Sequence, residues 1–176
     1  MNLFLIGYRG CGKSSVAPLL AKQLDWEVVD SDQVIQAEAG TTIAQIFDEQ
    51  GESAFRSLEQ TAITQLAQQD KQVVSLGGGA PMFQANRDVI SSTGKAVYLS
   101  APAEILWARI SGDAVSDTQR PDLTEDGGLT EVRNMLAVRD SVYAACADCT
   151  IDTHDLTVQE VADRILQWWQ TVDKTS

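Results

Sequence analysis

One segment near the start of the chain carries the full pattern of a phosphate-binding loop. It reads Gly7-Tyr-Arg-Gly-Cys-Gly-Lys-Ser14, between an apolar run and a helical pattern. Its glycines let successive N–H groups point into one concavity, and the following helix adds its positive dipole end. Lys13 would reach the β- and γ-phosphates, and Ser14 would be placed for Mg²⁺. The pattern predicts a nucleoside-triphosphate site with contacts from Gly10, Cys11, Gly12, Lys13, Ser14 and Ser15.

Two carboxylates form a second candidate group, in Asp30-Ser31-Asp32 after an apolar run. Ligands of open α/β sheets bind at the carboxyl ends of strands, and an extended chain directs both carboxylates to one side. Many phosphate-loop proteins place an acidic residue at the end of another strand, but the run 73–76 ends in glycines. Asp30 and Asp32 are therefore the expected acidic groups, with a helix cap as the alternative for either.

Three glycines and three arginines complete the set. Gly77-Gly78-Gly79 is costly in entropy unless the backbone must approach something closely, and a tight turn is the alternative. Arg56, Arg120 and Arg139 stand near expected loop or helix ends, where each by itself is most often a solvated surface residue. If they converge on one cleft, they can bind an anion.

These residues need a scaffold, and apolar patterns predict one. The predicted strands are 3–6, 27–30, 73–76, 96–99 and 149–152, and the predicted helices are 13–24, 31–38, 42–47, 52–69, 102–110, 129–145 and 158–169. The polar stretch 111–128 has no periodicity and predicts a mobile loop. Short apolar strands separated by helices favour one α/β domain, a three-layer sandwich around a five-stranded parallel sheet.

Composition and net charge limit the class of protein and the kinds of binding partner. The 176 residues are 44% hydrophobic and 22% charged, which is typical of a globular protein. A formal net charge of −12 argues against nucleic acid and anionic membranes as partners. No apolar run approaches the roughly 20 residues needed to cross a bilayer, and no signal peptide is visible. We expect a cytoplasmic protein and, because the chain can form its own core, a monomer.

The cysteines favour packing over chemistry. Cys146 and Cys149 form a C-x-x-C, but a metal or redox role would need a second pair, more than the one histidine, or a thioredoxin-like context. Cys146 falls at a predicted helix end and Cys149 at a strand start. We therefore expect buried thiols.

Six motifs follow one another along essentially the whole chain: the phosphate loop, Asp30-Ser-Asp32, Phe55-Arg-x-x-Glu59, Ser75-Leu-Gly-Gly-Gly79, Arg120-Pro121 and Arg139-x-x-x-Tyr143. This ordered set resembles the shikimate kinases. The resemblance implies a phosphate-loop fold similar to nucleoside-monophosphate kinases, with a mobile lid. It also implies phosphorylation of the 3-hydroxyl of shikimate by ATP with Mg²⁺, in the route to chorismate and aromatic amino acids.

The resemblance assigns roles on the acceptor side. Asp32 would bind the acceptor hydroxyl and is the candidate base. Arg56 and Arg139 would clamp the carboxylate of shikimate, a task suited to planar guanidinium groups. Glu59, three residues after Arg56 on the same helix, would orient it. Backbone contacts to the ring would come from Gly78 and Gly79.

On the nucleotide side, the resemblance places Asp30 in the outer shell of Mg²⁺ and lets Arg120 reach the phosphates. Arg120 would belong to a lid at about 111–128, which closes to exclude water. The whole chain, 1–176, would be a single kinase domain, with acceptor-binding helices at about 31–70.

Three departures from the family pattern concern the nucleotide side. The segment between Arg109 and Arg120 is a few residues longer, which leaves open the match of Arg109 to an adenine-stacking arginine. Asp122-Leu123 stands where the family usually has two leucines. Thr153-His-Asp155 replaces a basic adenine loop, so the adenine contacts, including any from His154, stay open.

Other functions share parts of this pattern. A kinase for gluconate, which also bears a carboxylate, or for a nucleoside monophosphate would use the same phosphate loop, although the ordered motifs favour shikimate. A GTP-dependent switch would normally carry Asn-Lys-x-Asp, and no Asn-Lys dipeptide occurs. A decayed binding module would be expected to lose Lys13, Asp32 or an acceptor arginine, and all are present.

Overall fold

The computed structural model describes residues 1–112 and 127–173. Its strands are β1 (Asn2–Ile6), β2 (Glu27–Asp30), β3 (Gln72–Ser75), β4 (Gly94–Ser100) and β5 (Cys149–Asp152). Its helices are α1 (Lys13–Leu24), α2 (Ser31–Ala39), α3 (Ile43–Leu66), the 3₁₀ turn η1 (Ala80–Met82), α4 (Gln84–Thr93), α5 (Ala103–Ser111), α7 (Gly128–Cys146) and α8 (Val158–Asp173).

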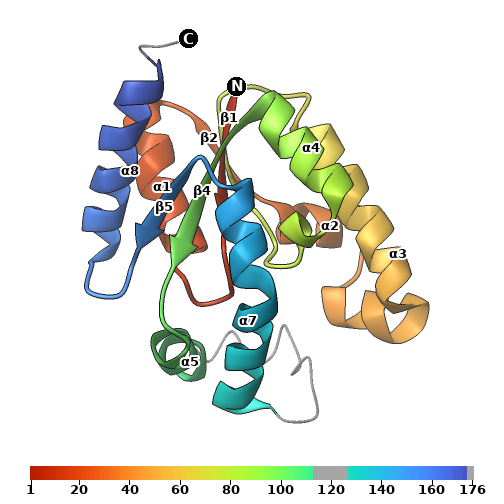
Figure 1. The fold of residues 1–176 in the computed structure, drawn as a ribbon. Coiled ribbons are helices and arrows are strands. Elements are labelled where there is room, and N and C mark those ends of the chain that lie inside the picture. The colour runs from red at the N-terminus through yellow and green to blue at the C-terminus, as the bar shows by residue number, and fades with distance from the viewer. Residues whose placement is uncertain (113–126, 174–176) are drawn as a thin grey trace.

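The strands form one parallel sheet in the order β2-β3-β1-β4-β5. Phe4 of the central strand faces Val74 on one neighbour and Ala96 on the other. Helices α1 and α8 pack together on one face, and α4 and α7 cover the other (Figure 1). The predicted three-layer fold around a five-stranded parallel sheet is confirmed.

Burial follows the position of each strand. Every residue of β1 is buried, because a central parallel strand is covered on both faces. The edge strands β2 and β5 contain exposed residues. A second, smaller core of Ile35, Ile43, Ile46, Phe55 and Ala62 holds α2 and α3 together, beside the main core around the sheet. No helix in the described part of the chain is long and apolar enough to cross a membrane.

The predicted helices 42–47 and 52–69 are both present, as the two segments of α3 on either side of a kink at Gly51, where the backbone is not helical (φ 82°, ψ 171°). Helix α4 was not predicted. Only Asn86 and Ile90 are buried along its ten residues, so it shows too little apolar periodicity to be recognised.

The cysteines differ in burial from the expectation. Cys11 is buried, but Cys146 at the end of α7 and Cys149 at the start of β5 are only half-buried. All three are free thiols, and burial raises the pKa of Cys146 and Cys149 above the ordinary value. The expectation of buried thiols was therefore wrong for this pair, because both residues lie where an edge strand meets the end of a helix.

Candidate active site

The phosphate loop has the backbone that its motif predicts. Gly7, Gly10 and Gly12 all have positive φ, and Gly12 directly precedes the first turn of α1. A Cβ on Gly12 would meet nothing within 4 Å, so its φ of 99° alone calls for glycine. A Cβ on Gly7 would instead lie 2.6 Å from the carbonyl oxygen of Leu99. The loop therefore lies close against β4 and leads directly into the first turn of α1, whose start carries the positive end of the helix dipole.

Lys13 is only 9% exposed, and its ammonium group stays over this loop. Nζ donates to the carbonyl oxygens of Gly7 at 2.8 Å and Tyr8 at 3.0 Å. Both acceptors are neutral, so the positive charge remains available to an anion bound in the loop.

Asp30 makes the helix-cap contacts and also faces the phosphate loop. One carboxylate oxygen accepts the N–H groups of Asp32 at 3.0 Å and Gln33 at 3.3 Å, and so caps α2. The other lies 3.5 Å from Oγ of Ser14 in the phosphate loop. A hydroxyl and a carboxylate at this separation are hard oxygen donors, and they fit a site for Mg²⁺.

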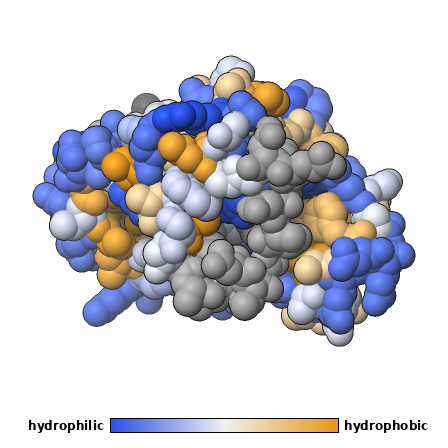
Figure 2. All heavy atoms as spheres, turned by 90° about the horizontal axis from the view of Figure 1, so that it is seen from below, coloured by the Kyte–Doolittle hydropathy of each residue, from blue (hydrophilic) through white to orange (hydrophobic). Residues whose placement is uncertain are grey.

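A cleft of about 690 Å³ opens along the phosphate loop. Its walls include the whole loop from Arg9 to Ser15, then Asp30 and Asp32, and at its far end Leu156, Val158 and Val161. Because the strands are parallel, these segments follow their carboxyl ends at one edge of the sheet. Figure 2 views this edge, where the described surface is mostly hydrophilic with separate hydrophobic patches.

Arg109 lies beside the loop after β5. Its Nη1 donates to Oγ1 of Thr153 at 3.0 Å, and its Nη2 donates to the carbonyl oxygen of Thr153 at 2.7 Å. Both residues line the cleft beyond the phosphate loop, whereas His154 is absent from the lining formed by the described residues. The basic group at this end of the cleft therefore comes from α5.

Three consecutive glycines bring the acceptor-side residues together. A Cβ on Gly77 would lie 2.6 Å from Oδ1 of Asp32, and a Cβ on Gly79 would lie 2.5 Å from Nη1 of Arg56. A Cβ on Gly78 would meet the Tyr143 hydroxyl at 3.6 Å and Nη1 of Arg139 at 3.9 Å, which are ordinary contacts. The glycines give close approach to side chains from α2, α3 and α7, which favours the close-approach interpretation over a simple tight turn.

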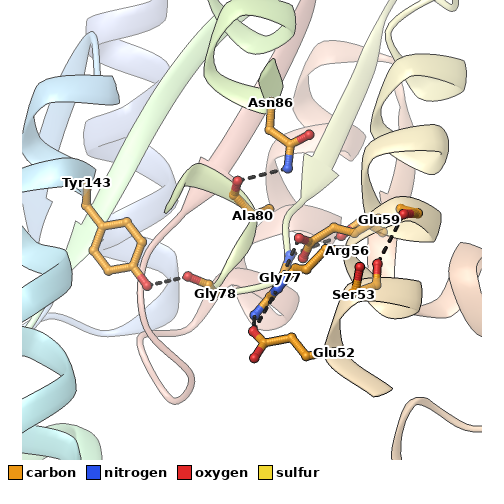
Figure 3. A network of polar contacts seen from close by, with 11 residues as sticks. Glu52, Ser53, Arg56, Glu59, Gly77, Gly78, Ala80, Asn86 and Tyr143 are labelled. Atoms are coloured by element: carbon orange, nitrogen blue, oxygen red, sulfur yellow. Dashed lines mark hydrogen bonds and ion pairs between the residues drawn. The ribbon is translucent and has the colours of Figure 1, made fainter. Parts of the chain in front are cut away.

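Arg56 is fixed from several sides (Figure 3). Its Nη1 donates to Oε2 of the buried Glu59 at 3.0 Å, and its Nε and Nη2 donate to Oε1 of Glu52 at 3.2 Å and 3.0 Å. The guanidinium carbon lies 5.1 Å from the ring centroids of both Phe55 and Phe83. Burial raises the pKa of Glu59, although the charge of Arg56 lowers it in part. The hydrogen bond from Arg56 to Glu59 is the contact that the expected orienting role of Glu59 requires.

Helix α7 supplies Arg139 and, one turn later, Tyr143. The Tyr143 hydroxyl donates to the carbonyl oxygen of Gly78 at 2.5 Å (Figure 3). Burial raises the pKa of Tyr143 to about 12, so the hydroxyl keeps its proton. The Arg139 guanidinium lies 5.9 Å from the ring centroid of Tyr8 in the phosphate loop. Arg139 therefore stands between the phosphate loop and the glycine loop.

A buried ion pair joins the phosphate loop to the start of α7. Nη2 of Arg9 donates to Oε1 of Glu131 at 3.0 Å, and the two side chains are 12% and 0% exposed. Sequence reasoning missed this pair, because 122 positions separate its members. It also missed Glu52 and the contact of Tyr143, although the i, i+4 spacings Glu52–Arg56 and Arg139–Tyr143 were available signals.

The structure separates the predicted site residues into two groups. The cleft contains the phosphate-loop residues together with Asp30 and Asp32. Arg56, Arg139, Gly78 and Gly79 meet around the glycine loop, next to Asp32. Arg120 and most of the predicted lid, residues 113–126, lie outside the described part of the chain.

The sequence matches one known family over nearly its whole length. The family model for shikimate kinase matches residues 9–170. A shikimate kinase of Rhodopirellula baltica is 40% identical over 166 residues, which are 94% of this chain and 89% of the relative. One of Pseudomonas aeruginosa is 38% identical over 169 residues, 94% of this chain and 96% of the relative.

Solved structures agree with this match. Shikimate kinase from Acinetobacter baumannii, solved in complex with shikimate, superposes with a TM-score of 0.89 at 34% identity, covering 97% of this chain and 93% of that one. The enzyme from Aquifex aeolicus gives a TM-score of 0.82 at 30% identity, covering 97% and 96%. With the phosphate loop, the paired aspartates and the glycine loop in place, this chain belongs to the shikimate kinase family.

Proposed function

We propose that this protein transfers the γ-phosphoryl group of ATP to the 3-hydroxyl of shikimate, in the route to chorismate and aromatic amino acids. Family membership and the likeness to a shikimate-bound enzyme support the reaction. The observation that carries it in this chain is the glycine loop 77–79. It brings a carboxylate, Asp32, and two guanidinium groups, Arg56 and Arg139, to one place beside a nucleotide cleft.

ATP would bind with its phosphates in the loop 7–14. The concave backbone and the helix start supply N–H donors, and Lys13 supplies a positive charge to the β- and γ-phosphates. Cys11, Gly12 and Ser15 also line the cleft there. The adenine end would reach the pocket between Arg109, Thr153 and the start of α8.

Mg²⁺ would be held by Ser14 directly and by Asp30 through water. The 3.5 Å separation of their oxygens fits a hard cation that keeps several waters and takes its other ligands from phosphate. When bound, the ion neutralises negative charge on the phosphates.

The acceptor side would bind shikimate by its two ends. Arg56 and Arg139 would clamp the carboxylate, and the backbone of Gly78 and Gly79 would contact the ring. Asp32 would then hold the 3-hydroxyl. Its carboxylate lies against Gly77 and in the wall of the nucleotide cleft, so it borders both groups of residues.

The reaction is an in-line displacement. The hydroxyl oxygen forms a bond to the γ-phosphorus, while the bond from that phosphorus to the bridging oxygen of ADP breaks. The hydroxyl proton passes to the carboxylate of Asp32, and ADP leaves with the electron pair. Lys13 and Arg120 would stabilise the charge on the transferred group.

Further parts of the proposal concern the whole chain. We treat residues 1–176 as a single kinase domain, with acceptor-binding helices at about 31–70 and a lid at about 111–128. A monomer is expected, which size-exclusion chromatography with light scattering would check. The cytoplasmic location stays a prediction, for cell fractionation.

A coupled ADP-release assay with MgATP tests the function. Shikimate, gluconate, a nucleoside monophosphate or no acceptor is added. Shikimate-dependent ADP release that disappears in Lys13→Ala is the expected result. Equal turnover of gluconate would overturn the specificity for shikimate. ATP turnover without any dependence on shikimate would keep the nucleotide site and overturn the acceptor.

A further inference from the structure

Arg56 is hydrogen-bonded to two carboxylates that differ strongly in their exposure to water. The Glu59 side chain is 1% exposed and takes Nη1, whereas the Glu52 side chain is 65% exposed and takes Nε and Nη2 through a single oxygen. All three guanidinium nitrogens therefore donate to a carboxylate. Water can therefore solvate the carboxylate on Nε and Nη2, which is that of Glu52, but not the carboxylate of Glu59 on Nη1.

Arg56 also has contacts that position it without Glu52. The ion pair with Glu59 holds one end of the guanidinium, and the rings of Phe55 and Phe83 lie 5.1 Å from its carbon. The backbone of Gly79 closes the same side, since a Cβ there would lie within 2.5 Å of Nη1. None of these contacts involves Glu52.

The position of Glu52 also allows its side chain to move away from Arg56. It is the first residue after Gly51, the kink with φ 82° at which the path of α3 is interrupted, and its side chain faces solvent. The Glu52 end of this i, i+4 ion pair is exposed to water, which weakens the pair, so an incoming carboxylate can replace Glu52. Glu52, Arg56 and Glu59 together carry one net negative charge, which opposes a second anion until Glu52 leaves.

On the basis of the proposed function, we propose that Glu52 is a specificity-determining residue that occupies the binding edge of Arg56 as a stand-in for the acceptor's carboxylate. The carboxylate of shikimate displaces Glu52 and takes over Nε and Nη2 by two parallel hydrogen bonds. Glu59 stays in place and keeps Arg56 oriented. An acceptor without a carboxylate cannot make this exchange.

Calorimetric titration of Glu52→Gln tests the exchange. Shikimate and its neutral methyl ester are each titrated into the wild type and the variant. Glutamine keeps the size of the side chain and removes the competing charge, so shikimate should bind about two- to threefold more tightly. The methyl ester should bind equally to both proteins, because it brings no charge to exchange.

Glu49→Gln is the matched control. Glu49 is an exposed residue of α3, and its change to glutamine removes the same unit of charge. Among the described residues, no hydrogen bond or ion pair joins Glu49 to Arg56. Its affinity for shikimate should equal that of the wild type.

Three results would overturn the inference. Unchanged or weaker binding of shikimate to Glu52→Gln would show that Glu52 is a bystander or a support for Arg56. Equal tightening in Glu49→Gln would point to the general surface charge. Equal tightening of the methyl ester would show that no carboxylate exchange occurs. If the wild-type protein also shows no shikimate-dependent ADP release, the proposed function is overturned as well. If ADP release by the wild type is normal, any of these three results overturns only the inference about Glu52.

Discussion

Gly77 and Gly79 are glycines because of the side chains beside them, and not because of their own torsion angles. Neither has a positive φ among the described glycines, but a Cβ on either would lie within 2.6 Å of Asp32 or Arg56. In both cases the nearest atom is the end of a side chain and not the backbone, so the contact can be relieved without a shift of the main chain. An added methyl group should therefore displace a functional group while it costs the fold little.

Gly79→Ala should raise the KM for shikimate by on the order of tenfold, because it displaces the Arg56 guanidinium. Gly77→Ala should lower kcat instead, since it displaces the carboxylate of Asp32. Steady-state kinetics with each variant checks the split. The same kinetic change in both variants would contradict the separate roles of Asp32 and Arg56.

In the proposed reaction, Lys13 and Asp32 act in the transfer step itself. Lys13→Ala and Asp32→Asn should each lower turnover by about two orders of magnitude or more, since each removes a group that acts on the reacting atoms. Circular dichroism should show an intact fold. Unchanged turnover in Asp32→Asn would remove Asp32 as base or positioning group.

We expect the buried Glu59 to make binding of the acceptor sensitive to pH. Burial raises its pKa above the ordinary value of 4.5, so the folded protein takes up this proton at a higher pH than the unfolded chain. Stability from this group is therefore gained as pH falls through the raised pKa toward 4.5, and lost as pH rises through it. Protonation weakens the ion pair with Arg56 over the same interval.

The KM for shikimate should accordingly rise as pH falls from neutrality through the raised pKa of Glu59. A pH series of KM for shikimate and for ATP measures this. In Glu59→Gln the KM for shikimate should already be high at neutral pH, and this inflection should be missing. An inflection that survives in the variant would assign the titration to another group.

At the scale of elements, α7 is the helix that contacts both the phosphate loop and the glycine loop 77–79. It places Arg139 beside Tyr8 of the phosphate loop and Tyr143 on the carbonyl oxygen of Gly78. These two residues are one turn apart on the same side of the helix, so one helix positions the acceptor clamp and the backbone of the glycine loop.

Arg139→Ala should raise the KM for shikimate by on the order of 100-fold, because it leaves the substrate carboxylate with one guanidinium. The KM for ATP should change far less. Initial rates over a grid of both substrate concentrations separate the two effects. A larger change for ATP than for shikimate would contradict the clamp.

At the scale of the whole molecule, the Arg9–Glu131 pair ties the start of the chain to the start of α7. The pair is almost fully buried, so removal of one member breaks a charge interaction that water screens little. Glu131→Ala should lower the free energy of unfolding by about 3 kcal/mol or more, as measured by urea denaturation. The double variant Arg9→Met/Glu131→Leu should lose less than Glu131→Ala.

Glu104→Gln is the control for this measurement. Glu104 also forms an ion pair with an arginine, Arg133, but both side chains are more than half exposed. Its loss should leave the unfolding curve almost unchanged, because water screens the pair. Equal destabilisation by Glu104→Gln and Glu131→Ala would contradict the role of burial.

Local patterns in the sequence determined the framework of this protein. The phosphate loop, five strands and most helices follow from glycine spacing and apolar runs, because backbone conformation and one-sided burial leave periodic marks within a few residues. Predicted and observed bounds agree at residues 13–24 and 27–30. Helix α4 left no such mark, since it buries only two residues.

Only the tertiary structure decided which side chains approach the glycine loop 77–79 and which groups contact Arg56 and Arg139. The contacts Gly77–Asp32, Gly79–Arg56 and Gly78–Tyr143 join segments separated by 23 or more positions, and Arg9 meets Glu131 across 122. No local periodicity encodes such pairs, because they arise where parallel strands end at one edge of a sheet. The sequence determined which groups are present, and the packing of α2, α3 and α7 around that edge decided which of them meet.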